Sequence, residues 1–185
     1  SKVLVAAVPA AIVGLLFDDI IDSYLYNPLT VAITLFVYGV LFIIIEKTKK
    51  PASIKNLNDL DYLTALKIGA FQMLALIPGT SRSGSTILGA SIVGCSRRVA
   101  SEFSFFLAIP MMFGASLLKL IKLKMSLDFA GIAILLTGMV VAFVVSVVAI
   151  KSLLKYIKKH DFTAFGIYRI VLAVIIAVCL LFEII

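Results

Sequence analysis

The sequence predicts an all-α integral membrane protein, a polytopic helical bundle that contains one re-entrant hairpin made from a broken helix. Composition and the arrangement of apolar runs both point to this class. Of the 185 residues, 62% are hydrophobic and only 15% are charged, and the mean hydropathy is +1.16. A soluble domain could not bury that much apolar surface. Long apolar runs recur along the chain, and small polar residues interrupt one of them.

Five apolar runs approach the length of membrane helices. A hydrocarbon core about 30 Å thick is crossed by about 20 mostly apolar residues. Inside lipid, backbone polar groups must be satisfied within the protein, which favours helices over loops. We expect residues 1–185 to form a single transmembrane domain. Its membrane helices are expected at about 3–17, 29–46, 100–118, 128–150 and 162–184.

The segment 62–95 contains the interrupted run. Neither of its apolar halves is long enough to span a bilayer comfortably. Membranes tolerate a break of this kind only where it is buried in protein or lines a wet cavity. We therefore expect a re-entrant hairpin over about 62–95. The interruption itself reads Pro78-Gly79-Thr80-Ser81-Arg82-Ser83-Gly84-Ser85-Thr86.

The net charge of +7 indicates membrane topology, because the basic residues gather in short links between apolar runs. No nucleic-acid partner is expected, since aromatic residues do not interleave with a basic surface patch. The positive-inside rule places the lysine-rich link 46–61 in the cytoplasm, and the acidic link 18–28 and the C-terminus then lie outside. Under this topology Lys119, Lys122 and Lys124 also lie outside, against the rule.

Arg82 is placed at the break, with hydroxyl side chains on both sides. A guanidinium at membrane depth costs about 3 kcal/mol or more, so an anion should offset it. A helix that begins at Ser83 would add free N–H groups and the positive end of its dipole, and Gly79 and Gly84 allow close backbone approach. These features predict a phosphate site. The alternative, a kink at Pro78 with small residues for helix packing, needs no guanidinium.

Other polar residues give weaker indications. Gln72 either faces the phosphate pocket or hydrogen-bonds across helices, and the sequence leaves both open. Glu102 either caps its helix and pairs with Arg97 or Arg98, or faces the site; capping and pairing are the expectation. Arg169 interrupts the last apolar run; it either approaches the lipid phosphate or snorkels to lipid headgroups, and snorkelling is the expectation.

The sequence contains no metal-ligating cluster. Cys95 and Cys179 lack a C-x-x-C spacing and are expected in helix packing, and the single histidine, His160, is expected to be solvated or to face headgroups. The Gly-Lys-Ser/Thr ending of nucleotide-binding loops is missing, so no nucleotide is implied. The chain starts with Ser1 inside an apolar run and shows no signal-peptide pattern, which indicates a portion of a longer protein.

The hairpin sequence from Ile77 to Thr86 resembles the P-G-x-S-R-S-x-x-T signature of the undecaprenyl-diphosphate phosphatase family, also called the bacitracin-resistance proteins. The resemblance implies a multi-pass enzyme of the bacterial inner membrane. It also implies two re-entrant hairpins in inverted repeats and an active site that opens toward the periplasm or outside. The similarity covers essentially the whole chain, including 7–16, Ile68-Gly69, Gln72, 100–105 and 108–110.

The resemblance further implies an activity and its residues. The expected reaction is hydrolysis of undecaprenyl diphosphate to undecaprenyl phosphate and inorganic phosphate, which recycles the lipid carrier for peptidoglycan synthesis in the cell wall and gives resistance to the antibiotic bacitracin. Arg82 would bind and neutralise the polyprenyl diphosphate, Ser81 would be the nucleophile or a donor to the phosphate, and Thr86 would supply a supporting hydroxyl. The expected substrate-binding residues are Gly79, Thr80, Ser83 and Gln72.

A divalent cation, Mg²⁺ or Ca²⁺, is implied as well, held chiefly by a glutamate-rich motif of an N-terminal repeat. No E-x-x-x-E segment precedes Val3, so the metal ligands and the general base are expected outside this chain. Two other functions remain open: a transporter or flippase for an anionic lipid, which would use a broken helix in the same way, and an inactive fragment of the phosphatase. A homo-oligomer is also left open.

Overall fold

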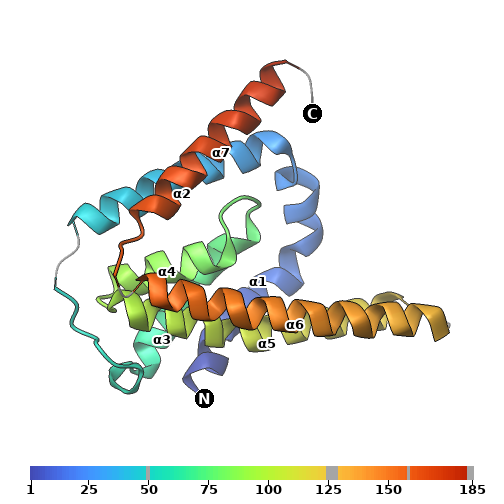
Figure 1. Cartoon of the computed structure of the whole chain (residues 1–185), viewed down its shortest axis with the longest axis horizontal. Helices are drawn as coiled ribbons and strands as arrows, with labels where there is room; N and C mark the ends of the chain where they lie inside the picture. Colours follow the sequence, from blue (N-terminus) through green and yellow to red (C-terminus); the bar gives the residue numbers. More distant parts are fainter. Residues whose placement is uncertain (49–50, 124–128, 158, 183–185) are drawn as a thin grey trace. The chain divides into compact units, whose positions relative to one another are not determined.

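The computed structural model describes residues 1–48, 51–123, 129–157 and 159–182, and every named element within these ranges is helical. The prediction of an all-α protein is confirmed. The helices fall into two compact units, one of Ser1–Met111 and Asp161–Ile185 and the other of Met112–His160. In chain order the elements are α1 (Lys2–Leu25), α2 (Pro28–Thr48), η1 (Leu57–Asp59), α3 (Tyr62–Met73), η2 (Leu74–Leu76), α4 (Arg82–Ile92), α5 (Arg97–Leu123), α6 (Phe129–Ile157) and α7 (Thr163–Leu181) (Figure 1).

Four described helices are long and apolar enough to cross a membrane: α2, α6, α7 and the Arg97–Leu118 part of α5. Helix α1 makes a fifth when its segments Lys2–Phe17 and Asp19–Leu25, bent by 76°, are taken as one span. By length and composition the chain is therefore a polytopic membrane protein, as predicted. Helix α5 continues through Lys119 and Lys122, which lie on the helix, and Lys124 lies outside the described residues.

Two helix pairs form the core of the first unit. Helices α2 and α7 pack side by side (Figure 1). A Cβ added to Gly39 would lie 2.7 Å from Cγ1 of Ile170. A Cβ added to Gly166 would lie 2.7 Å from the carbonyl oxygen of Gly39. Helices α1 and α3 approach as closely, because a Cβ on Gly69 would overlap the backbone of Ala6. Small residues therefore let both pairs pack backbone against backbone, as membrane helices commonly do.

Helix α3, the first arm of the hairpin, begins at a side-chain cap. The Asp61 carboxylate accepts a hydrogen bond from the backbone N–H of Thr64 at 2.7 Å. Hydrogen bonding by the Thr64 side chain, and then by its backbone, holds the pKa of Asp61 below its ordinary value. The contribution of this cap is therefore fully present above the ordinary aspartate pKa and is lost as the pH falls through the lowered one.

The two arms of the hairpin, α3 and α4, pack tightly and are closed at their base. A Cβ on Gly89 of α4 would lie 2.5 Å from Cβ of Phe71 on α3. At the base Gly94 has a φ of +96°, and its carbonyl accepts a hydrogen bond from the N–H of Ile54 at 3.1 Å, while Ser96 N–H donates to the Ile54 carbonyl at 2.9 Å. The chain turns back between η2 and α4, which gives the re-entrant hairpin of the predicted fold class.

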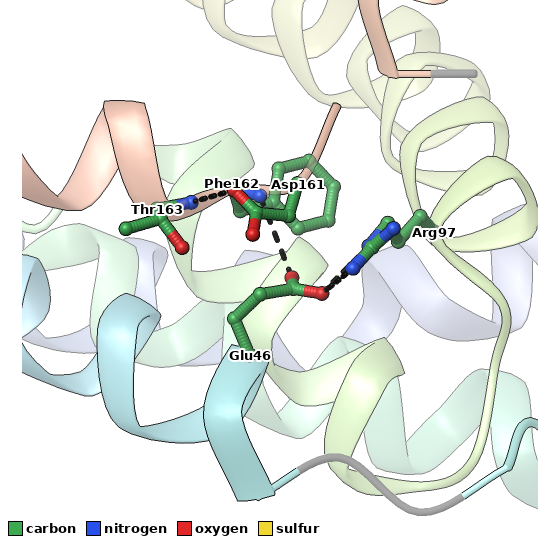
Figure 2. Close-up of polar contacts among 5 residues, drawn as sticks. All are labelled: Glu46, Arg97, Asp161, Phe162 and Thr163. Atoms are coloured by element: carbon green, nitrogen blue, oxygen red, sulfur yellow. Dashed lines mark hydrogen bonds and ion pairs between the residues drawn. The ribbon is translucent and has the colours of Figure 1, made fainter. Parts of the chain in front are cut away.

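Glu46 at the end of α2 and Arg97, Arg98 and Glu102 at the start of α5 form two ion pairs, and we call these four residues the base cluster. Figure 2 shows its contacts between the end of α2 and the starts of α5 and α7. Arg97 donates to Oε1 of Glu46, from Nε at 2.6 Å and also from Nη2, and Oε2 of Glu46 accepts from the N–H of Phe162 at 3.5 Å. Arg98 donates to Glu102 at 2.7 Å, which confirms the predicted pairing of Glu102. The predicted helix cap by Glu102 is wrong, because α5 already begins at Arg97.

The second unit contains the end of α5 and helix α6. Helix α6 exposes many large apolar side chains, Phe143 and Val144 among them. At its end the ring of Tyr156 stacks on His160, with centroids 4.4 Å apart. His160 is exposed, as predicted.

Candidate functional site

Hydrogen bonds from α2 and from within the hairpin itself hold the backbone of the hairpin tip, residues 77–81. The Thr34 hydroxyl donates a hydrogen bond to the Pro78 carbonyl at 2.6 Å. Gly79 has a φ of +86°, and a Cβ there would overlap the Thr34 hydroxyl, so only glycine fits. Thr80 is buried, and its hydroxyl donates to carbonyl oxygens of the preceding turn at 2.8 and 3.0 Å. Gly79 and Thr80 thus build the tip, and their part in substrate binding stays a prediction.

Ser81 joins the tip to α4 and holds an unusual backbone conformation. Its φ is +64°, a value found for no other non-glycine residue among those described, and such a conformation costs about 1–3 kcal/mol. Its hydroxyl accepts from the N–H of Gly84 and lies near the Ser83 hydroxyl, each at 3.3 Å. Helix α4 begins at Arg82, one residue before the predicted start. The exposed Ser81 hydroxyl therefore lies beside N–H groups that have no intrahelical acceptor.

Arg82 and Thr86 lie on successive turns of α4, next to α5. Nη1 of Arg82 donates to the backbone carbonyl of Ser104 at 3.4 Å. Thr86 is buried, and its hydroxyl contacts the Ser104 hydroxyl at 2.6 Å and the Arg82 carbonyl at 3.1 Å. Ser85 fastens the same helix to α2 through the Tyr38 hydroxyl at 3.2 Å. In this geometry Thr86 positions the turn that carries Arg82, while its predicted catalytic contact remains untested.

Arg169 of α7 reaches the hairpin tip, so the prediction that it snorkels to headgroups is wrong. Its Nη1 donates to the carbonyls of Thr80 at 3.1 Å and Gly79 at 3.4 Å. Its guanidinium carbon lies 5.6 Å from the ring centroid of Phe42, a cation–π distance. The sequence could not show this, because the packing of α7 on α2 turns Arg169 toward the protein and away from lipid.

The tip therefore has two arginines whose hydrogen bonds go only to uncharged oxygens. Within the described ranges, ion pairs are made by Arg97 and Arg98 of the base cluster and not by Arg82 or Arg169. Both tip arginines are half-buried. An arginine with reduced access to water and no carboxylate leaves its charge available to an anion.

Gln72, on the buried face of α3, is an exception to the usual pairing of polar groups. It is only 1% exposed, yet neither its Oε1 nor its Nε2 has a hydrogen-bond partner among the described residues. The alternative of a hydrogen bond across helices is therefore not realised there. That Gln72 faces the phosphate pocket stays a prediction.

The described residues do not fit a divalent cation. They contain no group of three or more histidine, cysteine, aspartate or glutamate side chains placed to hold a metal. Near Ser81 they provide the Ser83 hydroxyl and the Arg169 guanidinium, with Arg82 next in the chain, whereas hard cations bind best to carboxylates. Hydroxyl and guanidinium donors of this kind suit an anion better than a cation.

Comparison with known proteins agrees with the geometry. The family described as "Bacitracin resistance protein BacA" matches residues 1–175. A protein named "Undecaprenyl-diphosphatase" from Acetivibrio thermocellus is 62% identical over 178 residues, which cover 95% of this chain and 65% of that protein. Proteins of the same name from Enterococcus faecalis and Lactiplantibacillus plantarum are 60% and 56% identical over 181 residues, and each match covers 95% of this chain and 66% of the relative. The chain thus spans about two thirds of the length of these relatives.

Proposed function

The chain belongs to the bacitracin resistance protein BacA family, and from that premise we propose that it acts on undecaprenyl diphosphate, hydrolysing it to undecaprenyl phosphate and inorganic phosphate. The observation that carries the proposal is Arg82. It lies half-buried at the N-terminus of α4, beside the Ser81 hydroxyl, and makes no ion pair within the described residues. Its guanidinium suits a phosphoryl group, and the helix N-terminus adds to the attraction. Release of the monophosphate would recycle the carrier for cell-wall synthesis and underlie bacitracin resistance.

The exposed apolar surface supports a lipid as the substrate. Helices α1, α2 and α7 expose large apolar side chains, Leu16, Phe36 and Val171 among them, and such faces contact acyl chains in a bilayer. A prenyl tail could lie in lipid against these helices while its diphosphate reaches the hairpin tip. A soluble phosphate ester would gain nothing from this setting.

In the reaction that we propose, the terminal phosphorus gains an oxygen and its bond to the bridging oxygen breaks, so undecaprenyl phosphate leaves. Water supplies the new oxygen, either directly or after the Ser81 hydroxyl has taken the phosphoryl group. Arg82 and the free N–H groups of α4 would stabilise charge on the phosphoryl oxygens. Thr86 would hold Arg82 in place through its contact with Ser104. No histidine or carboxylate among the described residues hydrogen-bonds to Ser81.

A divalent cation, Mg²⁺ or Ca²⁺, stays part of the proposal for the whole enzyme, although the described residues of this chain do not form its site. We also propose that residues 1–185 form one transmembrane domain in the bacterial inner membrane, with the hairpin tip facing the periplasm or outside. The lysine-rich link before α3 favours this orientation, since basic links stay in the cytoplasm.

A second function, transport of an anionic lipid, is favoured by one observation. A short helix, α4, begins at the hairpin tip and directs its N-terminus there, as broken helices do in secondary transporters. A transporter and a phosphatase would share this anion site. They differ because only the phosphatase breaks a phosphorus–oxygen bond.

The deciding experiment uses liposomes that contain undecaprenyl diphosphate and this chain, alone or extended by the N-terminal repeat of a relative. Phosphate release and movement of the lipid between leaflets are measured together. The proposal predicts release that Arg82→Ala abolishes and that the exposed Arg98→Ala leaves unchanged. Lipid movement without phosphate release in both versions would refute hydrolysis and establish transport.

A further inference from the structure

Arg169 uses only part of its guanidinium at the hairpin tip. Nη1 donates to the carbonyls of Thr80 and Gly79. An arginine side chain has five N–H donors, and among the described residues no hydrogen bond is found from its Nη2 or Nε. The outer part of this guanidinium therefore has donors for a further acceptor.

Gly84 shows where one of these donors lies. The point that a Cβ on Gly84 would occupy is 2.9 Å from Nη2 of Arg169 and 3.4 Å from Oγ of Ser81. Nη2 thus lies against the first turn of α4, close to the Ser81 hydroxyl, and the missing side chain at Gly84 leaves room for it. One phosphoryl group could contact both atoms, because its oxygens accept hydrogen bonds in several directions.

The same guanidinium also supports the conformation of Ser81. A trans peptide directs its C=O and N–H to opposite sides. With the Thr80 carbonyl bonded to Arg169, the Ser81 N–H points away from that arginine. Ser81 has a positive φ, a conformation that persists only when neighbouring structure holds it. Arg169 is therefore placed to fix the Ser81 backbone through Nη1 and to meet a ligand through Nη2.

We propose that Arg169 is a second anion-binding arginine of this site, which contacts the phosphoryl group beside Ser81 through Nη2 and helps to select a diphosphate over a monophosphate. The inference rests on the proposed function, because it deepens the site built around Arg82. Two guanidinium groups, one from α4 and one from α7, match the greater negative charge of a diphosphate. The monophosphate product needs only one of them and binds more weakly.

The test measures binding of inorganic pyrophosphate and of inorganic phosphate to the chain in detergent by isothermal titration calorimetry. Arg169→Gln, Arg82→Gln and the exposed control Arg98→Gln are compared with the unchanged chain, and thermal unfolding verifies that each folds. Gly84→Ala is the second variant, since it keeps both arginines and places a methyl group against Nη2. Its backbone has no positive φ, so alanine fits the helix.

The inference predicts that Arg169→Gln and Gly84→Ala weaken pyrophosphate binding by about tenfold or more and phosphate binding by less. Arg98→Gln should change neither. If Arg169 has only a structural role, Arg169→Gln would weaken the binding of pyrophosphate and phosphate by the same factor, or would weaken neither, while Arg82→Gln still abolished binding. That result would overturn the inference and leave the proposed function standing. Failure of the unchanged chain to bind either anion would overturn the anion site, and the proposed function with it.

Discussion

The four arginines of this chain form two groups that differ in what they bind. At the base of the first unit, Arg97 pairs with Glu46 and Arg98 pairs with Glu102. At the hairpin tip, Arg82 and Arg169 donate only to carbonyl oxygens. Arginines with a carboxylate partner have their charge compensated within the fold, whereas arginines left with neutral acceptors keep their charge for a ligand.

Burial makes the contrast sharper. The Glu46 side chain is only 5% exposed, so its charge needs Arg97 and the Phe162 N–H to compensate for the loss of water. Among the described residues, no carboxylate compensates the charge of Arg82 at the tip. The base thus stabilises the fold, and the tip retains an unbalanced positive charge that an anion would neutralise.

The largest effect is expected at Arg82. Arg82→Ala should lower phosphate release from undecaprenyl diphosphate by about 10²–10³-fold, as removal of one donor to a transition-state oxyanion does in other enzymes. Thermal unfolding should change little, because the guanidinium makes only one long hydrogen bond within the chain. The assay uses the chain extended by the N-terminal repeat of a relative. Equal activity of Arg82→Ala and the unchanged chain would remove the distinction between tip and base.

The next effect concerns stability and belongs to Arg97. Arg97→Ala leaves the buried Glu46 charge with a single backbone donor. We expect the free energy of unfolding to fall by more than the cost of losing an exposed ion pair, about 1 kcal/mol, and by less than that of breaking a buried one, about 3 kcal/mol. Arg97 is itself 40% exposed, which favours the lower half of that interval. Denaturation in detergent measures it. The double variant Arg97→Met with Glu46→Gln should recover most of the loss, and a double variant as unstable as the single one would show that the pair is not its cause.

A smaller loss is expected at Thr86. Thr86→Val keeps the shape of the side chain but leaves the Ser104 hydroxyl without its partner at 2.6 Å, which should cost about 1–3 kcal/mol. Because this contact positions the Arg82 turn, phosphate release should fall on the order of tenfold. Thr86→Ser keeps the hydroxyl and serves as the matched control. Normal activity of Thr86→Val would show that α4 needs no anchor on α5.

The smallest effect is expected at Arg98. Its side chain is 66% exposed and pairs with Glu102 one helical turn away, so Arg98→Ala should change the free energy of unfolding by about 0.5 kcal/mol or less. Phosphate release should stay at the level of the unchanged chain. A loss of activity comparable to that of Arg82→Ala would contradict the assignment of Arg98 to the base cluster.

Much of the fold could be predicted because it depends on local sequence. Long apolar runs give the helices, and Pro78-Gly79 within small polar residues gives the turn of the hairpin. Arg82 stood out for the same reason, since a guanidinium in an apolar segment needs a partner wherever the segment lies. The start of α4 was misplaced by one residue because Ser81, with its positive φ, serves as the N-cap.

The partners that come from distant helices could not be predicted. A lone arginine in an apolar helix usually snorkels to headgroups, so the sequence favours that position for Arg169; the packing of α7 on α2 through Gly166 and Gly39 brings it to the tip. Glu46 closes its ion pair with a residue 51 positions away. Sequence reasoning finds groups that need a partner, whereas the fold decides which partner they obtain.

Arginine side-chain NMR in detergent can separate a tip that binds anions from a base that only stabilises the fold. The chain has four arginines, so ¹⁵N-arginine labelling gives four Nε–H signals, which single Arg→Lys substitutions assign. We expect inorganic pyrophosphate to shift the signals of Arg82 and Arg169 and to leave those of Arg97 and Arg98 in place. Shifts confined to Arg97 and Arg98, or saturable binding that moves neither tip signal, would contradict this expectation.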